Sequence, residues 1–132
     1  MKQTGFKYLL DSSVWLAYFQ AKDLGVKKLI EEPSNLLFTS VITLHEVKRK
    51  LRRNGQKDRD VQKILAFIKG RSILADVNPG IAEKSADDSI ENNLHTLDAI
   101  IYRTAMENKA VLATMDHDFK RIGNVLLFPP KS

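Results

Sequence analysis

Four carboxylates occur where an α/β chain would pass from a strand into a helix, and these residues are the best suited in the sequence to chemistry. Asp11 and Asp116 each follow an apolar segment, with Asp118 close behind the second, while Glu46 and Asp98 lie near the starts of predicted helices. In an open parallel sheet, such positions lie along the edge formed by the carboxyl ends of the strands. Carboxylates gathered there repel one another unless protons or cations neutralise them. The sequence therefore indicates a divalent-metal site and metal-assisted chemistry on a polyanion.

The expected cation is a hard one, because the candidate ligands are oxygen atoms. Mg2+ and Mn2+ prefer such ligands, and Mg2+ usually keeps several waters. One ion, or two about 4 Å apart, lowers the pKa of a bound water and contacts the attacking and leaving oxygens of a phosphodiester. No protein nucleophile is needed, and the sequence has no cysteine, no glycine-rich phosphate loop and no zinc-ligand spacing. The three histidines each lie near an acid, but sequence neighbours usually point in different directions, which disfavours a histidine–carboxylate iron or manganese site.

Each acidic residue also has a purely structural interpretation. Asp11 and Asp116 are suited to cap the helical segments that follow them, and the helix dipole would favour Asp98 in the first turn of its helix. Glu46 is placed to pair with Lys50 four residues later. These interpretations do not explain why all four acids fall at the same predicted sheet edge. Asp98 favours the metal site most strongly, because a carboxylate near the start of a largely apolar helix is partly buried and needs a partner.

A few neutral side chains near the acids also have two interpretations. Ser12, Ser13 and Thr114 are suited either to cap helices or to orient the carboxylates and the waters of a metal ion, and we assign the second role to Ser12 and Thr114. Trp15 and Phe19, four residues apart, are suited to stack on nucleobases, but their helical spacing is more typical of a hydrophobic core.

The charge distribution predicts a surface that binds phosphates. The chain of 132 residues carries a formal net charge of +5, and its positive residues cluster in one stretch. That stretch contains Lys48, Arg49, Lys50, Arg52, Arg53, Lys57, Arg59 and Lys63. A solvated pair of helix faces is the alternative interpretation of such a run. The absence of cysteine fits a reducing cytoplasm, and the start of the chain has no signal-peptide pattern. No apolar run is long enough to cross a bilayer, so no membrane association is expected.

Alternating strands and helices predict a parallel sheet covered on both faces. Strands are expected over residues 7–11, 36–39, 72–77, 110–114 and 125–128. Helices are expected after Ser13, over 24–30, after Ser40 or Thr43, through 61–68 as far as Gly70, over 79–90 and over 96–108. Asn54-Gly55 separates two basic helices, which are expected to form a hairpin that protrudes from the sheet.

Four segments, taken in order, resemble the PIN-domain family and, within it, the VapC-like toxins. These segments are LDSSVW at 10–15, SVITLHEV at 40–47, LDAIIYRTA at 97–105 and ATMDHDF at 113–119. The resemblance implies a three-layer α/β/α fold over residues 1–132, a single nuclease domain with a five-stranded parallel sheet of order 3-2-1-4-5. It implies a Mg2+- or Mn2+-dependent endoribonuclease in which Asp11, Glu46, Asp98 and Asp116 hold the metal and Asp118 assists. An antitoxin that wraps the site, and a homodimer, are the implied partners.

The basic stretch is expected to contact RNA through Lys48, Arg49, Arg52 and Arg53. PIN domains serve in toxins, in ribosomal RNA maturation and in RNA decay, and the single short domain favours the toxin. Two other classes are weighed against a nuclease. A signalling receiver domain would need paired acids after the first strand and a lysine after the last strand. A non-catalytic RNA-binding module would not need the acids that this chain retains.

Overall fold

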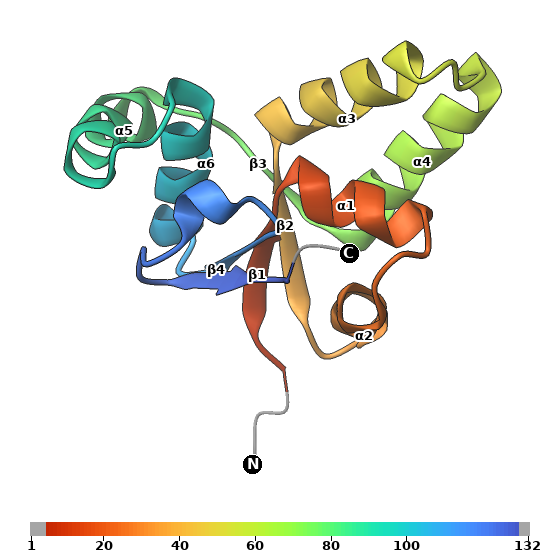
Figure 1. Ribbon diagram of the computed structural model, residues 1–132, viewed down its shortest axis with the longest axis horizontal. Coiled ribbons are helices and arrows are strands. Elements are labelled where there is room, and N and C mark those ends of the chain that lie inside the picture. The colour runs from red at the N-terminus through yellow and green to blue at the C-terminus, as the bar shows by residue number, and fades with distance from the viewer. Residues whose placement is uncertain (1–4, 130–132) are drawn as a thin grey trace.

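Five parallel strands form the centre of the molecule. The computed structural model describes residues 5–129, and the sheet has the strand order β3-β2-β1-β4-β5 (Figure 1). The strands are β1 (Lys7–Leu10), β2 (Leu36–Ser40), β3 (Ile73–Ala75), β4 (Val111–Thr114) and β5 (Val125–Leu127). The predicted α/β class and strand order are confirmed, and each strand is shorter or longer than its predicted range by only a few residues.

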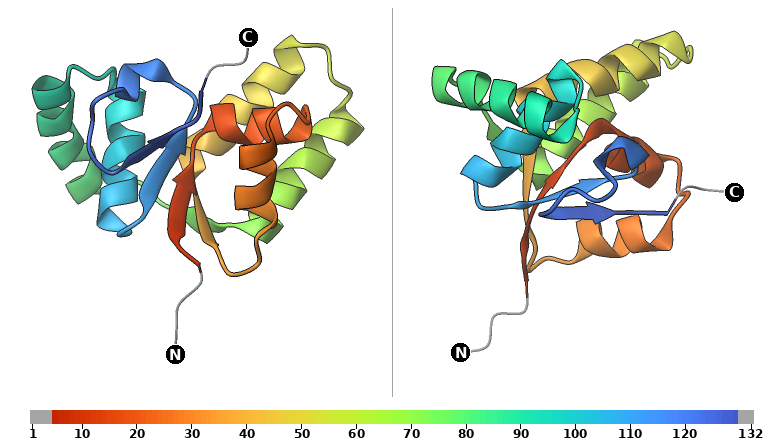
Figure 2. Two further views of the ribbon diagram at one scale, coloured as in Figure 1. Left: turned by 60° about the horizontal axis from the view of Figure 1, so that its bottom comes forward. Right: turned by 60° about the vertical axis from the view of Figure 1, so that its left-hand side comes forward.

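Helices cover both faces of the sheet, which gives the predicted three layers (Figure 2). They are α1 (Ser12–Phe19), α2 (Leu24–Glu31), α3 (Val41–Arg53), α4 (Asp58–Arg71), α5 (Pro79–Asn92) and α6 (Thr96–Glu107), with a short 3-10 helix, η1 (His117–Phe119). One core contains residues of α1, α2, α3 and α4, and the other contains residues of α6 and η1. Helix α5 packs on α6 rather than on the sheet.

The strand sequences produce these two cores because successive side chains point to opposite faces. Leu9 packs in the core beneath α6, whereas its neighbour Leu10 packs in the core beneath α1 to α4. Trp15 is fully buried in the core beneath α1 to α4, and its indole donates a hydrogen bond of 3.1 Å to the Thr39 hydroxyl. Phe19 is partly buried and packs against the same core, so the prediction that both aromatic residues belong to the core is confirmed.

Two local predictions about helix ends are wrong, and one pair of alternatives is resolved. The N-cap of α1 is Asp11, not Ser13, and the Asp11 carboxylate accepts a hydrogen bond from the Val14 backbone. Of the two candidate caps for α3, Ser40 is the one that caps it. Gly70 lies within α4, which continues to Arg71, because glycine weakens a helix without forbidding it.

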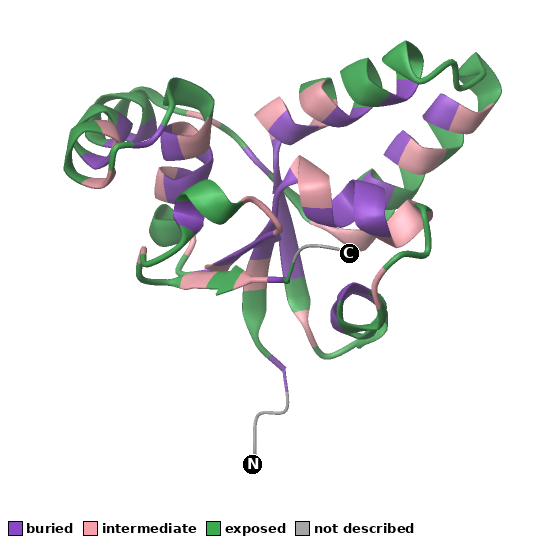
Figure 3. Cartoon of the chain, in the orientation of Figure 1, coloured by how far each residue is buried: buried purple, intermediate pink, exposed green. Residues whose placement is uncertain are grey.

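Helices α3 and α4 form the predicted protruding hairpin. Asn54 ends α3, and Gly55 adopts the left-handed conformation with φ 82°, which reverses the chain. An ion pair between Arg52 and Asp58 joins the two helices near the turn. Figure 3 shows that the tip of this hairpin is exposed, whereas the ends nearer the sheet are partly buried. Among residues 5–129, no helix is long and apolar enough to cross a membrane.

A buried ion pair fixes α6, the helix that carries Asp98, against α5. The Arg103 guanidinium donates from Nε and Nη2 to the two carboxylate oxygens of Asp88, at 2.8 Å and 2.7 Å. Asp88 is 4% exposed, so loss of Arg103 would leave a buried carboxylate without its partner. The two-point contact restricts how α6 rotates against α5, and thereby restricts where Asp98 points.

Candidate metal centre and adjoining basic cavity

The sheet brings the four predicted carboxylates into one cavity at the carboxyl ends of its strands. Asp11 follows β1 and Asp116 follows β4, while Glu46 extends from the second turn of α3 and Asp98 from the first turn of α6. All four line a cavity of about 260 Å³, which we call the acidic cavity. Each acid therefore comes from a different element, as expected for a site at the edge where parallel strands end.

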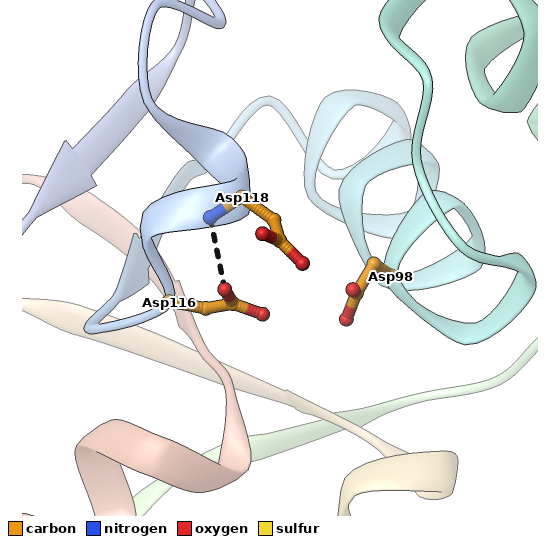
Figure 4. A group of neighbouring side chains, drawn as sticks. All are labelled: Asp98, Asp116 and Asp118. Atoms are coloured by element: carbon orange, nitrogen blue, oxygen red, sulfur yellow. Dashed lines mark hydrogen bonds between the residues drawn. The ribbon is translucent and has the colours of Figure 1, made fainter.

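Three carboxylates converge closely enough to share one ion. Oxygen atoms of Asp98, Asp116 and Asp118 all lie within 4.8 Å of one another (Figure 4). Asp116 caps η1, and its carboxylate accepts a hydrogen bond of 2.9 Å from the backbone of Asp118. Asp118 is exposed, whereas the other two are half-buried. Asp11 and Glu46 line the same cavity without belonging to this trio.

Asp11 is held in place by three hydrogen-bond donors. Its Oδ1 accepts from the Ser13 hydroxyl at 2.5 Å and from the Val14 backbone at 3.2 Å, and its Oδ2 accepts from the Thr114 hydroxyl. Asp11 is 8% exposed and Thr114 is fully buried. A buried carboxylate with this many donors has a fixed orientation, so its direction into the cavity is set before any ligand arrives.

The same hydroxyls connect Asp11 to the chain that follows β4. Thr114 Oγ1 accepts from the Asp116 backbone at 3.0 Å, and Ser13 Oγ accepts from the Met115 backbone at 3.0 Å. The Thr114 hydroxyl therefore bonds to both Asp11 and Asp116, about a hundred residues apart, and the Ser13 hydroxyl joins Asp11 to Met115. The Thr114 hydroxyl contacts Asp11 and the Asp116 backbone, and its role in orienting a metal site stays a prediction. Ser12 also lines the cavity, but of these two adjacent serines it is Ser13 whose hydroxyl donates to Asp11.

Burial and mutual repulsion raise the pKa of three of the acids. Desolvation raises the pKa of Asp11, although the hydrogen bonds from Ser13 and Thr114 oppose the shift. For Glu46, burial comes first, and the negative charges of Asp11 and Asp98 raise its pKa further. Burial together with the charges of Asp116 and Asp11 raises the pKa of Asp98 to about 6. The cavity is therefore short of positive charge.

The structural interpretations of the acids do not account for the cavity. Asp11 and Asp116 do cap helices, yet each keeps a carboxylate on the wall of the acidic cavity. Among residues 5–129, Glu46 and Lys50 do not form an ion pair within 4.0 Å. The positive charge of Lys50 lowers the pKa of Glu46, but burial and the charges of Asp11 and Asp98 raise it more. The converging trio consists of three carboxylates.

A second cavity, of about 710 Å³, lies between α1 and the outer part of α3. Its charged lining residues are all positive: Lys22, Arg49, Lys50 and Arg53, which define what we call the basic cavity. Two of the four predicted RNA-binding residues, Arg49 and Arg53, line it. The other two, Lys48 and Arg52, do not line it, and Arg52 instead pairs with Asp58.

Helical spacing explains which basic residues reach this cavity. Residues 46, 49, 50 and 53 lie on one face of a helix because they are three, four and seven positions apart. Lys48 and Arg52 fall on another face. This periodicity was available in the sequence and would have selected Lys50, which charge density alone did not. Lys22 is contributed by the loop after α1, and no local pattern marks it.

The family model described as "PIN domain" matches residues 8–125, which include all four quoted segments and every acid of the cavity. The chain belongs to the PIN-domain family. A comparison with curated proteins by sequence found no match.

Several solved structures share the fold of this PIN domain over nearly their whole length. A toxin–antitoxin complex from Klebsiella pneumoniae is 26% identical, with TM-score 0.70, covering 90% of this chain and 95% of that chain. VapBC2 from Rickettsia felis, bound to a promoter DNA fragment, is 20% identical with TM-score 0.73, covering 93% and 98%. Mycobacterium tuberculosis VapC20, described as a toxin that cleaves the sarcin–ricin loop, is 20% identical with TM-score 0.71, covering 93% and 99%.

Proposed function

We propose that this PIN domain, with residues 1–132 acting as one nuclease domain, is an endoribonuclease that hydrolyses RNA phosphodiester bonds with Mg2+ or Mn2+. The observation that carries the proposal is the junction of two unlike cavities. Asp11, Glu46, Asp98 and Asp116 gather in a cavity short of positive charge, and that cavity opens beside one lined by positive side chains. A polyanion bound in the second cavity places a phosphate next to the first.

The donor set supports a hard divalent cation. Three carboxylate oxygens within 4.8 Å of one another match the needs of an ion that takes a few oxygen ligands and completes its shell with water and phosphate. The raised pKa values of Asp11, Glu46 and Asp98 mean that their negative charges are unfavourable in the cavity, and a bound dication would offset those charges. When bound, Mg2+ or Mn2+ supplies a water of lowered pKa and stabilises charge on the phosphate oxygens.

The chain's own residues then have distinct tasks. Asp98, Asp116 and Asp118 would hold the ion, with Asp11 and Glu46 directed into the same space. Ser13 and Thr114 keep Asp11 in one orientation, so the ligands require little rearrangement when the ion binds. In the overall reaction a water oxygen bonds to phosphorus, the bond from phosphorus to one ribose oxygen breaks, and that oxygen takes up a proton.

The basic cavity is the proposed path of the RNA backbone. Arg49, Arg53 and Lys22 line it and would contact successive phosphates, whereas Lys48 and Arg52 add longer-range attraction from the outer face of α3. Contacts of this kind supply affinity that weakens as salt increases, and they carry no sequence information by themselves.

We further propose that the protein acts in the cytoplasm as the toxin of a toxin–antitoxin pair and forms a homodimer. The support for the toxin role comes from its structural neighbours: the Klebsiella pneumoniae protein is named as part of a toxin–antitoxin complex, and the Rickettsia felis protein as part of VapBC2. An antitoxin segment covering the acidic and basic cavities would block metal, RNA or both. Growth arrest on expression of the wild type, relieved by Asp98→Asn, would support the toxin role, and unimpaired growth with wild-type protein present would contradict it.

The nuclease is tested by incubating purified protein with RNA, with added Mn2+ or with excess chelator. Cleavage is expected only with the metal, and it is expected to be lost in Asp98→Asn. Asp87→Asn is the matched control, because Asp87 is an exposed acid on α5 outside both cavities. Cleavage that survives the chelator, or that survives Asp98→Asn while the purified protein remains folded, would overturn the proposal.

A further inference from the structure

The acidic and basic cavities share three lining residues, Ser13, Lys50 and Met115. The Ser13 hydroxyl is already engaged, since it donates to Asp11 and accepts from the Met115 backbone. The Met115 side chain offers no strong donor. Lys50 is therefore the residue at the junction that can bind an anion, and it is the positive residue that lines the acidic cavity.

Resting on the proposed nuclease function, we propose that Lys50 binds the phosphate at which the RNA is cut. Arg49 and Arg53 line only the basic cavity, so they contact phosphates on one side of that position. The helical face that carries them runs on to Glu46, and Lys50 stands four residues after this acid, at the boundary between the two cavities. A phosphate that passes from one cavity to the other must pass Lys50.

Electrostatics give this position a specific task. The reacting phosphate enters a space lined by the carboxylates Asp11, Glu46, Asp98 and Asp116, which repel it. During phosphoryl transfer, charge spreads over the equatorial oxygens of the phosphate, so a cation placed there stabilises the transition state more than the bound substrate. The lysine side chain suits this task, because its ammonium has three donors on a flexible stem and follows a moving group.

The competing interpretation is that Lys50 only neutralises Glu46 along the helix. Lys50 is exposed, and within the described part of the chain it makes no ion pair within 4.0 Å. A solvent-exposed helical pairing of this kind contributes little stability. If neutralisation were its whole task, a bound dication would replace it, and Lys50 would have no effect on the rate at saturating metal.

The two interpretations are separated by the steady-state kinetics of Lys50→Gln at saturating Mn2+. We expect kcat to fall by about 100-fold, the usual effect of removing one donor from a charged transition state, with a much smaller change in KM. Lys50→Arg keeps the charge and is expected to recover much of the rate. Lys69→Gln, which removes an exposed positive charge from α4 outside both cavities, serves as the control.

Binding of Mn2+ alone provides a readout independent of turnover. Because Lys50 repels a dication in the acidic cavity, Lys50→Gln is expected to bind Mn2+ at least as tightly as the wild type, measured by calorimetry. Slower cleavage by a variant that binds metal normally supports the proposal. Two outcomes would overturn the inference about Lys50 but leave the proposed nuclease function standing. One is an unchanged kcat in Lys50→Gln beside an active wild type, and the other is a loss of rate explained by weakened Mn2+ binding. An inactive wild type overturns both.

Discussion

The acidic and basic cavities differ in how firmly the fold holds their side chains. In the acidic cavity, Asp11 is buried and accepts three hydrogen bonds, and the remaining acids come from three further elements. In the basic cavity, Arg49 and Arg53 are exposed and lie on a single helix, while Lys50 stands at the boundary with the acidic cavity. Chemistry at one phosphate requires fixed geometry, whereas attraction of a polyanion requires only charge within reach. We therefore expect the acidic cavity to control the rate of RNA cleavage and the basic cavity to control the affinity for RNA.

The largest effects are expected from the acids themselves. Asp11→Asn, Glu46→Gln, Asp98→Asn and Asp116→Asn should each abolish RNA cleavage while the protein remains folded, because each change removes a charge on which the metal site depends. Gel assays at saturating Mn2+ and circular dichroism measure the two properties. Cleavage at the wild-type rate by two or more of these variants would show that the acidic cavity does not control the cleavage rate.

A metal-binding measurement tests the same residues without turnover. Mn2+ should raise the melting temperature of the wild type, because a ligand that binds only the folded state stabilises it. Asp98→Asn should reduce that rise, whereas Asp87→Asn should not. An equal Mn2+-induced rise in the wild type and in Asp98→Asn would place the ion outside the acidic cavity.

An intermediate effect is expected from the hydroxyl group that orients Asp11. Thr114→Val keeps the size of the buried side chain but removes the donor to Asp11 and the acceptor for the Asp116 backbone. Cleavage should fall about 10-fold to 100-fold, the usual result of losing a group that orients a metal ligand. Thr114→Ser retains the hydroxyl and should stay close to the wild-type rate. Equal rates in all three proteins would show that Asp11 needs no such support.

The sequence was sufficient to predict the sheet, its strand order and the four acids of the cavity. The parallel sheet and the acids at its edge follow from apolar strands, alternating elements and the rule that parallel strands end at one edge, whereas the strand order was predicted from the resemblance to the PIN-domain family. It also indicated that Asp98 would be partly buried, and burial is the first cause of its raised pKa. Local patterning therefore carries most of the information about which residues the fold gathers.

Details that depend on side-chain direction were not predicted. Ser13 was assigned as a cap, but the carboxylate of Asp11 competes for the same role and prevails. The basic run was treated as one surface, although α3 directs Arg49 and Arg53 into a cavity and pairs Arg52 with Asp58. The contribution of Lys22 depends on how α1 packs against α3, and no pattern in the sequence encodes that contact.

A smaller effect, on affinity alone, is expected from the basic cavity. Removing two phosphate contacts in Arg49→Gln with Arg53→Gln should reduce the slope of log K against log salt by about 1.4, at roughly 0.7 per contact on a single strand. The charge-matched pair Lys48→Gln with Arg52→Gln should reduce it less, because those residues line neither cavity. The rate at saturating RNA should change little in either double variant. Equal slopes would show that only total charge matters on this helix.

The smallest effect is expected in the stability of the metal-free protein as the pH changes. Asp98 has a pKa of about 6 in the folded protein against an ordinary value of 3.8, so between these values the folded state holds a proton that the unfolded state has released. The stability contributed by this proton is present at low pH and is lost as the pH rises through about 6. The raised pKa values of Asp11 and Glu46 act in the same direction, whereas the lowered pKa values of exposed Glu31 and Glu32 act against it.

The contribution of Asp98 is isolated by the difference in melting temperature between the wild type and Asp98→Asn, measured in chelator. This difference should shift in favour of the wild type as the pH falls from about 7 to about 5. With saturating Mn2+ the sign should reverse, because protons then compete with the ion for the same oxygens. A difference that stays constant with pH in chelator would show that Asp98 does not share the crowded acidic cavity in solution.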